Sequence, residues 1–130
     1  MIFVDTGIWF ARFVPDDPEH ARVTAWFAAN QEPLVTSDYC VDEVLTLLLA
    51  RKRPQLSVVA GGVLFSESLA RLHFVTRPQI ERAWILFQQR IAIGLSFTDC
   101  TSKMVIDDFG IDVVAAFDTH FHQFGLTLAP

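Results

Sequence analysis

The sequence predicts an α/β fold, a three-layer sandwich in which a mostly parallel central sheet is flanked by helices on both faces. Short apolar segments typical of strands alternate along the chain with longer segments of helical period, as parallel sheets require. Apolar residues make up 52% of the 130 residues, which excludes a disordered chain. A chain of this length suits one core, so we expect a single domain over residues 1–130.

Clear boundary signals divide the first part of the chain. Residues 1–4 are all apolar and end at Asp5, which is typical of a short strand buried on both faces. A helix is expected over residues 18–30, because Asp17 is a good N-cap and proline is favoured at the first helical position. Residues 33–36 are expected to form a second short strand.

The middle of the chain predicts two helices, a strand and a further helix. The segment 38–50 has an apolar face with helical spacing, formed by Val41, Val44, Leu45, Leu48 and Leu49. Residues 55–70 are also expected to be helical, with the glycine pair 61–62 as a weak point. A third strand is expected over residues 72–76, and Pro78 then begins an amphipathic helix.

The last part of the chain continues the alternation of helix and strand. A helix is predicted over residues 98–109, and Gly110 ends it. Residues 113–117 form an apolar strand that ends at Asp118, and a short helix and a last strand over 126–129 follow. This order of elements predicts a mostly parallel sheet with helices on both faces.

The charge balance argues against a passive nucleic-acid clamp. Acidic residues exceed basic ones by 15 to 10, whereas proteins that bind phosphate backbones usually carry a basic excess. Setting four particular acids aside leaves eleven acids against ten bases, so the acidity can belong to a site and not to the whole surface. Those four acids are Asp5, Glu43, Asp99 and Asp118.

Two of the acids follow directly after apolar strands. Asp5 and Asp118 come at the carboxyl ends of their strands, where functional groups gather in open α/β sheets. Each also has an ordinary structural explanation. Asp118 is a suitable N-cap for the next helix, and Asp5 is followed by the turn-forming pair Thr6-Gly7.

The other two acids lie on predicted helices. At 100° per residue, Glu43 points away from the apolar face of its helix, beside Leu47, and a solvated glutamate would lie there too. Its neighbour Asp42 is a rival for the same role. Asp99 lies in the first turn of its helix, where the helix dipole alone favours a carboxylate. Each acid is ordinary alone, so the argument depends on the set.

Four segments, in order along nearly the whole chain, carry a recognisable pattern: Val4-Asp5-Thr6, Glu43, Phe97-Thr98-Asp99 and Phe117-Asp118-Thr119-His120-Phe121. Together they resemble the PIN domain, and within it the small VapC-type toxins of prokaryotic toxin–antitoxin pairs. Residues 51–95 carry no matched motif. The resemblance implies an endoribonuclease that depends on Mg²⁺ or Mn²⁺ and hydrolyses RNA phosphodiester bonds with water activated by the metal.

The resemblance also assigns roles to individual residues. Asp5 and Asp99 would be direct metal ligands, and Glu43 and Asp118 would bind a second ion or orient the attacking water. Thr6 would position a carboxylate or a metal-bound water. The partners implied are an RNA substrate, a cognate antitoxin and a second copy in a homodimer. A cytoplasmic protein without membrane association is expected, and neither the RNA target nor the antitoxin follows from the sequence.

Two other functions stay open at this point. A phosphoaspartyl-type phosphotransfer domain also places an aspartate at a strand end beside Mg²⁺, but Asp5-Thr6-Gly7 lacks the second acid two residues on. The other alternative is a catalytically silent binding module of PIN-like fold. His120 and His122 are interpreted as surface or substrate-facing residues and not as metal ligands, because residues i and i+2 of a helix do not face one another. Cys40 and Cys100 are interpreted as buried thiols.

Overall fold

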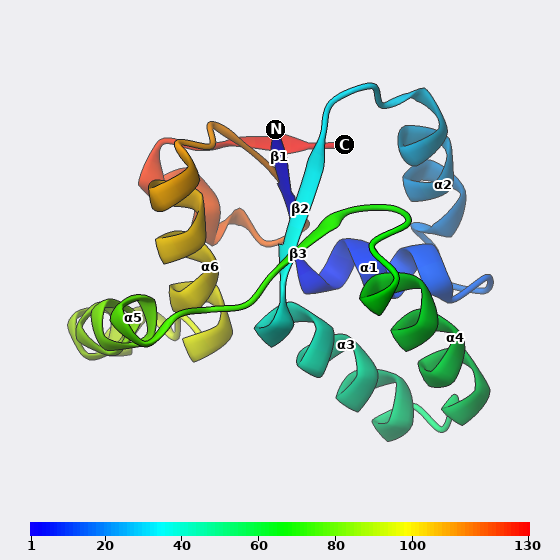
Figure 1. Ribbon diagram of the computed structural model, residues 1–130, viewed down its shortest axis with the longest axis horizontal. Coiled ribbons are helices and arrows are strands. Elements are labelled where there is room, and N and C mark those ends of the chain that lie inside the picture. Colours follow the sequence, from blue (N-terminus) through cyan, green and yellow to red (C-terminus); the bar gives the residue numbers. More distant parts are fainter.

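The computed structural model describes residues 1–130 and confirms the α/β prediction (Figure 1). Its central sheet has five strands in the order β3-β2-β1-β4-β5, and every neighbouring pair is parallel. The strands are β1 (Ile2–Val4), β2 (Leu34–Ser37), β3 (Arg71–His73), β4 (Val113–Ala115) and β5 (Thr127–Ala129). The helices are α1 (Thr6–Phe13), α2 (His20–Ala29), α3 (Asp38–Ala50), α4 (Pro54–Phe65), α5 (Arg77–Gln89), α6 (Phe97–Phe109) and the short 3₁₀ helices η1 (Ile91–Ile93) and η2 (Thr119–Phe124).

Helices cover both faces of the sheet, because successive strand side chains alternate between them. Ile2 and Val4 of β1 pack into one apolar cluster with α1 to α4, whereas Phe3 packs into a second cluster with α6 and η2. Figure 1 shows α1, α2 and α4 on one side of the sheet and α6 on the other, with α5 outside α6. This is the predicted three-layer arrangement.

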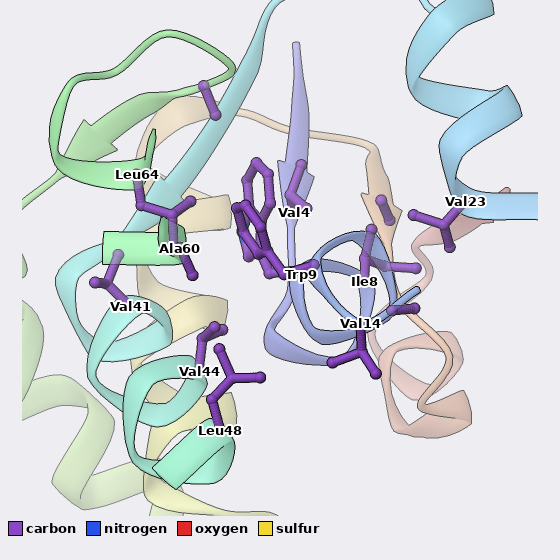
Figure 2. Packing of buried hydrophobic residues seen from close by; sticks show 14 of the residues in the cluster. Val4, Ile8, Trp9, Val14, Val23, Val41, Val44, Leu48, Ala60 and Leu64 are labelled. Atoms are coloured by element: carbon purple, nitrogen blue, oxygen red, sulfur yellow. The ribbon is translucent and has the colours of Figure 1, made fainter. Parts of the chain in front are cut away.

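The larger cluster is built around Trp9, which is fully buried. Figure 2 shows side chains from α1, α3 and α4 converging on this face of the sheet, among them Trp9, Val44 and Ala60. The glycine pair that was expected to weaken α4 does not interrupt it. Gly61 faces Leu45 of α3, and a Cβ on this glycine would lie 3.5 Å from Cδ2 of that leucine, which is an ordinary van der Waals contact.

Several element boundaries differ from the prediction. Helix α1 was not predicted, and it begins at Thr6, inside the pair Thr6-Gly7 that was interpreted as turn-forming. Asp17 caps a turn by accepting the Glu19 amide at 2.8 Å, and α2 begins only after that turn. Helix α4 ends before residue 70, because Glu67 adopts a left-handed φ of 56°.

Two strands are also shorter than expected, β3 ending at His73 and β4 at Ala115. After β4 the chain stops pairing with the neighbouring strands. The last backbone hydrogen bond to β5 runs from the Ala116 amide to the Ala129 carbonyl at 3.0 Å. No helix combines the length and the apolar character needed to cross a lipid bilayer.

Candidate metal centre

The first acid lies where the sheet topology changes direction. From β1 the order runs outward through β2 on one side and through β4 on the other, and in open α/β sheets ligands bind at the carboxyl ends of strands at such a point. Asp5 follows β1 directly, and its amide donates to the Ala115 carbonyl of β4 at 2.9 Å. The Asp5 side chain makes no capping hydrogen bond to α1, so the turn alternative does not account for it.

Helix capping orients two of the other acids. Ser96 caps α6 by accepting the Asp99 amide at 3.0 Å, and Oδ2 of Asp99 accepts the Ser96 amide at 3.4 Å. Asp118 caps η2, because its Oδ1 accepts the His120 amide at 2.9 Å. The capping roles therefore exist, and they fix the directions in which these carboxylates point.

The fourth acid is presented by α3. This helix begins after Ser37, whose Oγ accepts the Cys40 amide at 3.2 Å. Glu43 is half-buried one turn later, whereas its neighbour Asp42 is exposed. The angular argument therefore placed Glu43 correctly, beside Leu47 and away from the apolar face of α3.

All five residues singled out from the sequence line one hollow of about 440 Å³. Four segments far apart in the chain meet there, namely the end of β1, the second turn of α3, the first turn of α6 and the loop after β4. The lining residues are Asp5, Thr6, Gly7, Glu43, Leu47, Gly94, Ser96, Asp99, Phe117 and Asp118. The structure thus brings the four acids and Thr6 together.

The hollow carries negative charge that no lysine or arginine side chain neutralises. None of the ion pairs formed by lysine or arginine includes Asp5, Glu43, Asp99 or Asp118. Burial raises the pKa of Asp5 to about 7, the neighbouring charges of Asp99, Glu43 and Asp118 add to this, and the Thr6 amide offsets only part of it. Burial also raises the pKa of Asp99, as do the charges of Asp118 and Glu43, against hydrogen bonds from Ser96.

The residues of the hollow fit a divalent cation. Ligand atoms of Asp99, Asp118 and His120 all lie within 4.8 Å of one another, which is close enough to surround one ion. The Thr6 hydroxyl is buried and has no hydrogen-bond partner, as expected of an oxygen that awaits a water or an ion. Carboxylate and hydroxyl oxygens suit Mg²⁺ and Mn²⁺.

His120 is the residue that the sequence interpretation missed. Residues at i and i+2 of a helix do not face one another, so His120 and His122 were not expected to act together. His122 is exposed, in agreement with this expectation. The informative spacing is Asp118-x-His120, because an aspartate that caps a 3₁₀ helix brings the second residue of that helix against its own carboxylate. Nδ1 of His120 lies 3.1 Å from Oδ1 of Asp118.

Both cysteines are buried thiols, as predicted. Sγ of Cys40 lies 4.0 Å from Oδ1 of Asp5, and burial together with the Asp5 charge raises the pKa of this thiol to about 11. Burial, with the charge of Asp99, raises the pKa of Cys100 to about 11 as well. Neither group is suited to act as a nucleophile.

The fold is a parallel sheet between two helical layers, and four acidic side chains gather where the strand order runs outward in both directions from β1. Residues 2–125 match the PIN domain family, and the chain belongs to that family. It is 32% identical over 125 residues to VapC20 of Mycobacterium tuberculosis, a 23S rRNA-specific endonuclease, which covers 96% of this chain and 95% of the relative.

Two further comparisons agree with this result. A VapC ribonuclease of Archaeoglobus fulgidus is 29% identical over 124 residues, covering 91% of this chain and 77% of that protein. The crystal structure of Mycobacterium tuberculosis VapC20, described as a sarcin-ricin loop cleaving toxin, matches with a TM-score of 0.90 at 29% identity. The match covers 98% of this chain and 97% of the VapC20 chain.

Proposed function

We propose that this chain is a metal-dependent endoribonuclease and the toxin of a type II toxin–antitoxin system. The observation that carries the proposal is the convergence of Asp5, Glu43, Asp99 and Asp118 on one hollow in which no lysine or arginine neutralises them. Such an arrangement is costly for a protein without a bound cation, because the charges repel. The activities named for VapC20 and for the Archaeoglobus fulgidus relative support the proposal.

Mg²⁺ or Mn²⁺ is the proposed cofactor. When bound, such a cation stabilises charge that develops on the phosphate and makes water a stronger nucleophile. Asp5 and Asp99 would hold the ion, because Asp5 is buried, Asp99 is half-buried, and the raised pKa of each carboxyl shows that its charge lacks a partner. Glu43 and Asp118 would orient the attacking water or hold a second ion. The unpartnered hydroxyl of Thr6 would fix a neighbouring carboxylate or a water.

The proposed substrate class is large-subunit ribosomal RNA, on the strength of the names given to VapC20. The hollow is not purely polar, since Leu47 and Phe117 form part of its wall. The aromatic ring of Phe117 is suited to contact a nucleotide base while the metal centre formed by the acids acts on the phosphate of that nucleotide. The proposal includes a cognate antitoxin that blocks the hollow, and a homodimer as the active form.

The test is cleavage of RNA by the purified chain with Mg²⁺, Mn²⁺ or EDTA. The substrates are intact ribosomes, a sarcin–ricin loop oligonucleotide and an unrelated structured RNA. A folded Asp99→Asn variant is the matched control, because asparagine keeps the side-chain oxygen that accepts the Ser96 amide. Cleavage that requires a metal and is lost in the variant is expected. RNA binding without cleavage under all conditions would favour the silent binding module.

A further inference from the structure

One side of the acidic hollow is flanked by a histidine ring that no structural role explains. The His120 amide is held by Oδ1 of Asp118 at 2.9 Å, which places the ring beside that carboxylate. Its Nδ1 lies 3.1 Å from the same oxygen, and the ligand atoms of Asp99, Asp118 and His120 lie within 4.8 Å of one another. The group therefore offers one nitrogen and two carboxylate oxygens to a common point.

A simple ion pair between His120 and Asp118 does not account for this contact. Nδ1 is buried and makes no hydrogen bond although Oδ1 is within 3.1 Å, so a proton on this nitrogen would not point at the carboxylate. With no proton between Nδ1 of His120 and Oδ1 of Asp118, the lone pairs of these two atoms repel each other at 3.1 Å. A cation between them removes that repulsion.

The other histidines have different surroundings. Nδ1 of His20 contacts the Ala11 carbonyl at 2.7 Å, and Nε2 of His73 contacts the Gln79 side-chain oxygen at 2.8 Å. His122 is exposed and is not part of the group formed by Asp99, Asp118 and His120. The buried hydroxyl of Thr6, which lines the hollow and has no partner, is an independent sign that the hollow receives a ligand.

We propose that Nδ1 of His120 is a ligand of the metal centre, together with Asp99 and Asp118, and that it makes the centre prefer Mn²⁺ to Mg²⁺. This inference rests on the proposed function. Imidazole suits transition-metal ions, whereas Mg²⁺ is a hard ion that selects oxygen ligands, so a nitrogen ligand shifts the preference of an otherwise all-oxygen centre.

The test compares the wild-type chain with His120→Gln and His122→Gln. Glutamine keeps a polar group near the position of Nε2 and removes Nδ1, and the second variant makes the same change at an exposed site two residues away. Binding of MnCl₂ and MgCl₂ is measured by calorimetry on the full chain. Electron spin-echo spectroscopy of bound Mn²⁺ then detects coupling to an imidazole nitrogen, which a merely structural role would not produce.

We expect nitrogen coupling in the wild type and in His122→Gln, and its loss in His120→Gln. The ratio of Mn²⁺ to Mg²⁺ affinity should fall about tenfold or more in His120→Gln only. Bound Mn²⁺ without nitrogen coupling in the wild type would overturn the inference, and metal-dependent RNA cleavage would then still support the proposed function. A wild-type chain that binds neither ion would overturn both.

Discussion

The indole Nε1 of Trp9 donates a 3.0 Å hydrogen bond to Oγ1 of Thr36, and this buried contact fixes the strand end that presents Asp5. The threonine hydroxyl donates in turn to the Val4 carbonyl at 2.9 Å. Because Val4 immediately precedes Asp5, a chain of two hydrogen bonds ties α1 and β2 to the residue before the first acid. The large core residue therefore positions the site as well as stabilising the fold.

Removing either of these two hydrogen bonds should lower the stability of the folded protein. Thr36→Val removes the hydroxyl and leaves the Trp9 N–H buried without an acceptor, which should lower the free energy of unfolding by about 1 to 3 kcal/mol. Urea unfolding of Thr36→Val, Trp9→Phe and the double variant measures the coupling. The double variant should lose less than the sum of the single losses, and strict additivity would show that the two residues act independently.

Glu43 and Asp42 are adjacent acids for which we expect opposite outcomes. Glu43→Gln should lower RNA cleavage about a hundredfold or more, because this carboxylate lines the hollow and interacts with Asp5 and Asp99. Asp42→Asn changes an exposed residue of the same helix and should stay within about twofold of the wild type. The measurement is the initial cleavage rate at saturating metal. Equal losses in both variants would contradict the assignment of Glu43.

Mg²⁺ should stabilise the folded chain. An ion that binds only the folded state contributes about 2.7 kcal/mol at a hundred times its dissociation constant. For a chain of this size that corresponds to a rise in melting temperature of about 10 °C. Differential scanning fluorimetry with MgCl₂ or EDTA measures it, with Asp99→Asn as the variant in which the rise should be much smaller. An unchanged melting temperature of the wild type at saturating Mg²⁺ would argue against a metal centre.

The two buried thiols should be inert in the folded chain. With pKa values of about 11, only about one thiol in a thousand is ionised at pH 8, and burial also blocks access. Iodoacetamide at pH 8 should leave both Cys40 and Cys100 unmodified in the native chain and alkylate both in urea, as judged by mass spectrometry. Rapid alkylation of Cys40 in the native chain would show that the structure around Asp5, which Cys40 contacts, opens.

The parts of the site that could be predicted are those that depend on local pattern. Asp5 directly after an apolar run, and Glu43 opposite the apolar face of its helix, follow from strand and helix periodicity. The link from Trp9 to Thr36 could not be found this way, because it joins residues 27 positions apart through tertiary packing. His120 was missed because its approach to Asp118 depends on the geometry of a 3₁₀ helix and its cap.

The pH dependence of stability offers a separate test of the electrostatics. The pKa of Asp5 is raised from 3.8 to about 7 by burial and by the neighbouring acids, so the folded chain holds this proton more tightly than the unfolded chain does. The stabilisation from the proton is complete below pH 4 and is lost as the pH rises to about 7, because the folded state must then ionise a buried carboxyl. The pKa of Asp99 is also raised, which adds a contribution of the same sign.

In EDTA, the wild-type chain should therefore lose stability relative to Asp5→Asn as the pH rises from 5 to 7. The difference in the free energy of unfolding between the two proteins should change by about 2 to 3 kcal/mol over this range, because one pH unit corresponds to about 1.4 kcal/mol. Urea unfolding at each pH measures this difference. Saturating Mg²⁺ should reverse the trend for the wild type, because the cation competes with the proton for the same carboxylate and binds better once the proton has left. A wild-type curve parallel to that of Asp5→Asn in EDTA would mean that Asp5 is already ionised at pH 5, and it would contradict a pKa raised by burial and by the neighbouring acids.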